Sequence, residues 1–188
     1  MLPGYGLGAG AFFVLFYTWP LKYIDRPLHF LNRVMSLIDS EVIRQYNDDG
    51  AAVVRGCISD HWLEILNDAI EHDIRDPGPF VHAYQAGSGG GRFHGNLRTW
   101  ETEARFHDFC FNSPLPEMAA AILASAKINL LYDQLFVKEP GTPNRTRWHN
   151  DQPYWAMRGW QVLSFWVALD PVNKRSGALE FIPGSHRW

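Results

Sequence analysis

Apolar residues recur with two different periods along the chain, and each period predicts a different kind of element. Over residues 40–46 and 61–74 they return every three or four positions, the spacing of one face of an α-helix. Ser59 is a good N-cap residue shortly before the second of these segments. Residues 115–126 (LPEMAAAILASA) are rich in alanine and predict a third helix.

A period of two appears mainly in the second half of the chain. We predict short strands at residues 51–55, 128–140, 161–169 and 178–182. In the longest of them one face would carry Tyr132, Gln134, Phe136 and Lys138, and the other Asp133, Leu135 and Val137. Helices followed by short strands predict an α+β fold whose second part is a β-barrel or jelly roll.

The N-terminal part of the chain breaks this pattern. Residues 7–19 (LGAGAFFVLFYTW) are almost wholly apolar, but a membrane span needs about 20 apolar residues, so we expect no span here. Met1–Gly6 contains no lysine or arginine, which weakens the alternative of a secretory signal. Met35 begins a natural helix, turn and strand pattern. We therefore expect residues 1–34 to be an extension, or the product of a mis-set start, outside the fold, and residues 35–188 to form one domain.

Composition narrows the class of protein and its partners. The chain has 188 residues, of which 46% are hydrophobic and 20% charged, as in a globular domain. Its net charge of -3 and pI near 6.2 give no reason to expect nucleic acid as a partner. Cys57 and Cys110 lie far apart without a CxxC spacing, which favours a reducing, cytoplasmic compartment over a disulfide framework or a zinc site.

Candidate chemistry is concentrated in residues 146–155 (TRWHNDQPYW). His149 and Asp151 are separated by one residue, so on an extended strand both side chains leave the same face. With one further histidine they would make the 2-His-1-carboxylate triad that binds Fe(II) and leaves coordination positions open. Taken alone, a His-x-Asp tripeptide is more often an ordinary surface pair.

Several linked motifs surround this tripeptide in order. They are residues 138–141 (KEPG), 148–155 (WHNDQPYW), 164–172 (SFWVALDPV), 176–179 (SGAL) and 182–188 (IPGSHRW). In order and spacing they resemble the phytanoyl-CoA dioxygenase family of Fe(II)- and 2-oxoglutarate-dependent oxygenases, closely over residues 130–188 and more loosely from about Ser40 onward. The resemblance implies a double-stranded β-helix, a cupin-like jelly roll with N-terminal flanking helices, of which this chain holds the first part.

The resemblance also implies roles for individual residues. His149 and Asp151 would be catalytic iron ligands. Gln134, Lys138 and Trp166 would contact the cosubstrate 2-oxoglutarate, Lys138 by pairing its cation with a carboxylate. A solvated lysine at a strand end is the competing interpretation of Lys138.

Two further residues would contact the substrate, and part of the site is missing. Trp155 and Arg98 match positions that border the substrate in relatives, although a tryptophan is more often part of the core. His186 lies in a family signature but is not a metal ligand in relatives, whose third ligand and 2-oxoglutarate-binding arginine come later. Since the chain ends at Trp188, we expect an incomplete form of an oxygenase that hydroxylates a C–H bond of a small molecule with molecular oxygen. The alternative is a non-catalytic jelly-roll binding protein.

Overall fold

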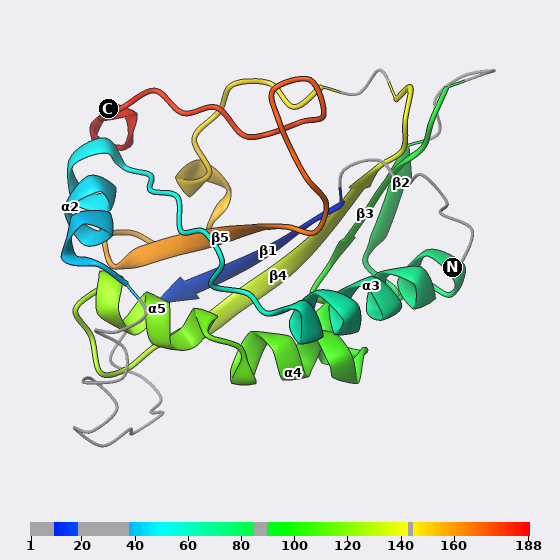
Figure 1. The fold of residues 1–188 in the computed structure, drawn as a ribbon, viewed down its shortest axis with the longest axis horizontal. Coiled ribbons are helices and arrows are strands. Elements are labelled where there is room, and N and C mark those ends of the chain that lie inside the picture. Colours follow the sequence, from blue (N-terminus) through cyan, green and yellow to red (C-terminus); the bar gives the residue numbers. More distant parts are fainter. Residues whose placement is uncertain (1–9, 19–37, 85–89, 143–144) are drawn as a thin grey trace.

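The computed structural model describes residues 10–18, 38–84, 90–142 and 145–188. These residues form a five-stranded antiparallel sheet of order β2-β3-β4-β1-β5, with helices packed along one face (Figure 1). The strands are β1 (Gly10–Tyr17), β2 (Val81–Tyr84), β3 (Phe93–Leu97), β4 (Asn129–Lys138) and β5 (Val162–Ala168). The α-helices are α2 (Ser40–Asp49), α3 (Asp60–Arg75), α4 (Ala104–Asn112) and α5 (Leu115–Ile122), and the 3-10 helices are η1 (Thr99–Glu101), η2 (Gln152–Tyr154) and η3 (Ser185–Arg187).

The three predicted helices are confirmed as α2, α3 and α5. The Asp39 carboxylate caps α2 by accepting a hydrogen bond from the Glu41 N–H at 3.0 Å, and Gly50 ends the helix with a left-handed φ of 84°. Helix α4 was not predicted, because its sequence ARFHDFCFN mixes aromatic and polar residues and contains strong helix formers only at its first two positions. It forms because Phe106, Phe109 and Cys110 are buried on one face.

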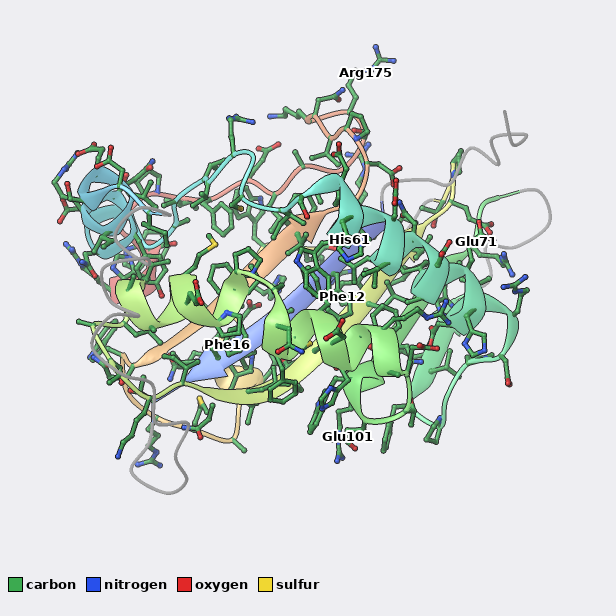
Figure 2. All side chains as sticks on the ribbon, turned by 60° about the horizontal axis from the view of Figure 1, so that its bottom comes forward. Phe12, Phe16, His61, Glu71, Glu101 and Arg175 are labelled. Atoms are coloured by element: carbon green, nitrogen blue, oxygen red, sulfur yellow. The ribbon has the colours of Figure 1, made fainter. Side chains whose placement is uncertain are left out.

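Strand β1 corrects the expectation that residues 1–34 lie outside the fold. Gly10–Tyr17 pairs antiparallel with both β4 and β5, and Phe12, Val14 and Phe16 are at most 2% exposed. Figure 2 turns the helical layer forward and shows Phe12 and Phe16 beneath α4 and α5. A continuous apolar run that is too short for a membrane is also the pattern of a strand buried on both faces. Residues 1–9 and 19–34 lie outside the described residues.

Two other predicted strands are wrong. Residues 51–55 and 178–182 are irregular, and their apolar side chains Val53, Phe181 and Ile182 are exposed. Extended apolar residues become a strand only when a neighbour supplies the ladder hydrogen bonds. The α+β class is confirmed, whereas the jelly roll stays a prediction because the described residues build a single sheet.

The two faces of the sheet differ in what covers them. On β4, Asp133, Leu135 and Val137 are buried against the helices, whereas Tyr132, Gln134, Phe136 and Lys138 are half-buried on the opposite face, as the period of two predicts. Figure 1 shows α3, α4 and α5 below the sheet and residues 145–160 above it. We call the upper face of the sheet the loop-side face. Within the described part of the chain, no helix has the length and apolar character needed to cross a membrane.

Candidate metal and cosubstrate site

His149 and Asp151 lie in an irregular segment that precedes η2, and their side chains converge. The expectation that an extended strand would align them is wrong, since no ladder partner adjoins residues 145–151 in the described structure. Their convergence nevertheless holds, because His149 Nε2 lies 3.0 Å from Asp151 Oδ1. Both side chains are accessible, with exposed fractions of 41% and 44%.

The hydrogen bond of the other ring nitrogen, Nδ1, shows which role Nε2 has in this short contact. His149 Nδ1 lies 2.6 Å from the Arg147 carbonyl oxygen. A carbonyl oxygen carries no proton, so Nδ1 must be the donor in this hydrogen bond. A neutral His149 then has a lone pair on Nε2, which faces the Asp151 carboxylate. Two acceptors come this close only with a proton or a cation between them.

The spacing of His149 Nε2 and Asp151 Oδ1 fits two ligands of a divalent metal ion. Neighbouring ligands at about 2.1 Å from an octahedral cation are about 3 Å apart, which is the separation of these two atoms. A backbone carbonyl that accepts from the second ring nitrogen is also the usual partner of a metal-binding histidine, because it fixes the tautomer. Over residues 10–18, 38–84, 90–142 and 145–188 no group of three His, Cys, Asp or Glu side chains could hold a metal ion. The described residues thus bring together two possible ligand atoms, His149 Nε2 and Asp151 Oδ1.

The segment that carries this pair is fastened to β4 at two points. Lys138 Nζ donates to Thr146 Oγ1 at 3.0 Å, before His149. Trp155 Nε1 donates to the Tyr132 hydroxyl at 3.1 Å, after Asp151. Both β4 residues lie on the loop-side face, so the His149–Asp151 pair is held over the same strand that carries Gln134.

Lys138 is the positive group of this face. Its ammonium lies 5.2 Å from the centre of the Phe93 ring, and partial burial lowers the pKa of Lys138. In this structure the ammonium donates to the neutral Thr146 hydroxyl. A partly desolvated cation of this kind gains most from an anionic partner.

Gln134 and Trp166 stand in one row across the sheet. Both are in register with Phe13 of β1, so one strand separates them. Two interstrand spacings amount to about 10 Å between their Cα atoms. Trp166 is half-buried, while its neighbour Val167 is buried against the helices, which places Trp166 on the loop-side face with Gln134.

Arg98 follows β3 and is already paired. Its guanidinium donates to both carboxylate oxygens of Glu101, at 2.8 and 2.9 Å, and lies 5.0 Å from the centre of the Phe80 ring. The Arg98 backbone is left-handed, with φ 56°, and its N–H donates to the Asp133 carbonyl at 2.9 Å. Arg98 is therefore fixed beside β4, and contact with a substrate stays a prediction.

Sequence reasoning did not assign Tyr132 and Asp133, which are neighbours on β4. Tyr132 contacts Trp155, and the period of two that placed it beside Gln134 and Lys138 was a usable signal. Asp133 is fully buried on the helix side, where burial raises its pKa to about 6 despite hydrogen bonds from Thr99 and the Trp100 N–H. Its position on the same predicted strand face as Leu135 and Val137 was a usable signal for a buried carboxylate.

Comparison with known proteins places the chain in a family. No curated protein and no solved structure matches the chain. Residues 46–188 match the family described as phytanoyl-CoA dioxygenase (PhyH), a range that includes all seven residues predicted for the site. Because this match covers most of the chain, the protein belongs to the phytanoyl-CoA dioxygenase family.

Proposed function

We propose that this protein is an Fe(II)- and 2-oxoglutarate-dependent dioxygenase that hydroxylates an unactivated C–H bond of a small organic substrate. The observation that carries the proposal is the approach of His149 Nε2 to Asp151 Oδ1 at 3.0 Å while Nδ1 donates to a backbone carbonyl. This arrangement leaves two acceptor atoms aimed at the position of a cation. Family membership supplies the kind of cation and cosubstrate.

The proposed roles follow the layout of the loop-side face. His149 and Asp151 hold the iron, and Gln134, Lys138 and Trp166 hold 2-oxoglutarate beside it. When bound, iron and 2-oxoglutarate supply the oxidising chemistry with molecular oxygen, while the protein orients the reacting C–H bond and excludes water. Lys138 exchanges the Thr146 hydroxyl for a carboxylate of the cosubstrate, a charge-assisted contact that partial burial strengthens.

Substrate contacts are proposed for Trp155 and Arg98. The half-buried Trp155 ring lies at the far end of the segment that carries the metal ligands. Arg98 would offer its guanidinium to an anionic substrate group in exchange for Glu101, an exposed partner of modest strength. Both residues contact β4, Trp155 through the Tyr132 hydroxyl and Arg98 through the Asp133 carbonyl.

The test is oxygen-dependent release of succinate from 2-oxoglutarate by the Fe(II)-loaded protein, with and without candidate substrates. His149→Ala should abolish it. The matched control is His72→Ala, because His72 Nδ1 lies 3.1 Å from Glu103 Oε2, a His–carboxylate contact outside the candidate site. Binding of 2-oxoglutarate without any turnover would favour the second candidate, a non-catalytic binding protein, and would contradict the enzyme.

A further inference from the structure

Strand β4 is irregular next to the candidate site. Leu15 of β1 pairs with Tyr132, but the next residue, Phe16, pairs with Leu130, so Leu131 is an extra residue on β4. A β-bulge of this kind increases the local twist and changes the direction of the neighbouring side chains. Tyr132 is the first residue after the bulge and lies on the loop-side face.

The Tyr132 hydroxyl receives the indole proton of Trp155. The Trp155 Nε1 to Tyr132 oxygen distance is 3.1 Å, and an indole N–H can only donate. Burial, with a smaller contribution from the Asp151 carboxylate, raises the pKa of Tyr132. The phenol therefore stays neutral at physiological pH, and it lies close enough to Asp151 to sense its charge.

Trp155 is in turn connected to Asp151 by backbone hydrogen bonds. The Tyr154 N–H donates to the Asp151 carbonyl at 2.9 Å, and the Trp155 N–H donates to the Gln152 carbonyl at 3.0 Å. These two bonds make η2 a short rigid turn between the carboxylate residue and the indole. Whatever fixes the indole thus also fixes Asp151.

Little else in the described structure holds this segment. Residues 145–150 are exposed, and η2 has no buried residue. The anchor at its other end is the single contact between Lys138 and Thr146. On the Asp151 side, the Gln152 side chain donates to the Gly159 carbonyl at 3.2 Å within the same loop. The half-buried Trp155 indole donates to Tyr132, and this hydrogen bond ties the Asp151 side to the sheet.

We propose that Tyr132 is a positioning residue for the His149–Asp151 pair, which it holds over β4 through the Trp155 indole and the η2 turn. The inference rests on the proposed function, since it assumes that the pair binds a metal ion. It assigns Tyr132 no contact with metal or substrate. Its role is to raise the fraction of molecules in which Asp151 is in place to bind.

The first test is Mn(II) binding by the 188-residue protein, followed by electron paramagnetic resonance. Tyr132→Phe should weaken binding between about twofold and tenfold, the range expected for the loss of one net hydrogen bond. The matched control is Tyr46→Phe, which removes a phenol hydrogen bond to the Val162 carbonyl at 3.3 Å on the same sheet, away from the segment. The control should bind Mn(II) like the wild type.

A double-mutant cycle separates positioning from general loss of stability. Trp155→Phe should weaken Mn(II) binding about as much as Tyr132→Phe. The double variant should be no weaker, because both changes remove the same hydrogen bond. In ¹⁵N spectra the Trp155 indole N–H, identified by its loss in Trp155→Phe, should exchange faster with solvent in Tyr132→Phe.

The outcomes distinguish this inference from the proposed function. If the wild type binds no Mn(II), the proposed function is overturned, and the positioning role falls with it. If the wild type binds but Tyr132→Phe matches Tyr46→Phe in affinity, or if the two losses add in the double variant, the positioning role alone is overturned.

Discussion

The Asp133 carboxylate of β4 accepts a hydrogen bond from the Thr99 hydroxyl at the start of η1, and the two residues are 0% and 1% exposed. The Trp100 N–H donates to the same carboxylate, at 3.3 and 3.2 Å to its two oxygens. The Asp133 carbonyl meanwhile accepts from the Arg98 N–H at 2.9 Å. One residue thus fixes the whole turn that carries Arg98 beside β4.

This buried carboxylate should make stability fall as the pH rises. Burial raises the folded-state pKa of Asp133 to about 6, above an unfolded value of about 3.9, so the folded state binds the proton more tightly. Protonated Asp133 contributes its full stabilisation of the folded state below about pH 4. This stabilisation is lost as the pH rises through about 6, and the total loss is about 3 kcal/mol. Asp133→Asn, which stays neutral, should lose less stability between pH 4 and pH 7 than the wild type.

Urea denaturation at pH 4 and pH 7 measures this difference directly. Asp108→Asn on the surface of α4, where the carboxylate accepts from Asn112 at 2.6 Å, is the control and should follow the wild type. An Asp133→Asn variant with the wild-type pH response would show that the Asp133 carboxyl does not titrate differently in the folded protein.

Strand β1 should contribute a large part of the core. Phe12 is fully buried, stacks on Phe106 with ring centres 4.9 Å apart, and meets the edge of Phe109 at 5.7 Å. Phe12→Ala should therefore lower the free energy of unfolding by about 3–5 kcal/mol. Phe181→Ala, at a residue that is 60% exposed, should cost far less. Equal small losses in chemical denaturation would return residues 10–17 to the status of an extension.

The parts of the fold that the sequence predicts well are those where local pattern and tertiary context agree. Helix α3 has both an apolar period and a capping residue, and β4 alternates along its buried half, so both were predicted. Strand β1 was not predicted because a strand in the middle of a sheet need not alternate between apolar and polar residues, and an uninterrupted apolar run near the N-terminus has several competing interpretations. The strand predicted at residues 178–182 is wrong for the opposite reason, since this segment has a strand pattern but no partner strand in the described structure.

The candidate site also has a part that the sequence predicts and a part that it does not. The facing of Gln134 and Lys138 follows from the period of two and could be predicted. The His149–Asp151 contact could be predicted only as a shared facing, because it is made by an irregular segment whose path depends on the contacts of Thr146 and Trp155. No local pattern encodes a hydrogen bond between residues as far apart in sequence as Tyr132 and Trp155.

The C-terminal segment should depend on a glycine at the end of α2. The Gly184 N–H donates to the Asp49 carbonyl and the Arg187 guanidinium to the Asn47 carbonyl, both at 2.8 Å, so this segment caps the helix (Figure 1). A Cβ on Gly50 would lie 2.3 Å from Nδ1 and 2.6 Å from Cγ of His186. Gly50→Ala should therefore displace η3 and expose residues 184–188 to limited proteolysis.

Gly56→Ala separates this clash from backbone strain. Gly56 is also left-handed, with φ 68° against 84° for Gly50, but a Cβ there would meet nothing within 4 Å. Each alanine should cost about 1–2 kcal/mol for the left-handed conformation. Only Gly50→Ala should add the proteolytic sensitivity, and equal sensitivity of the two variants would mean that His186 does not pack on α2.

Lys138 should set the affinity for the cosubstrate. Lys138→Met keeps most of the side-chain volume but removes the cation that would pair with 2-oxoglutarate, so the Kd for 2-oxoglutarate should rise by about tenfold or more. Lys174→Met is the control, since Lys174 is 82% exposed and pairs with Glu180. Isothermal titration in the presence of Mn(II) measures both, and a Lys138→Met variant with wild-type affinity would mean that Lys138 is only a solvated strand-end residue.

The metal affinity of the pair should fall as the solution becomes more acidic. With Nδ1 committed to the Arg147 carbonyl, a proton on Nε2 and a metal ion compete for the same lone pair opposite Asp151. Binding of Mn(II) should therefore release a proton, which titration in buffers of different ionisation enthalpy would register.

Asp151→Asn keeps the size of the side chain but removes its charge, and it should weaken binding at every pH. His149→Ala should abolish both the binding and the proton release, whereas His72→Ala should leave both unchanged because its ring nitrogen belongs to a separate ion pair with Glu103. Equal Mn(II) affinity in His149→Ala and His72→Ala would reduce the His149–Asp151 contact to a surface ion pair, and the proposed iron site would lose both of its described ligands.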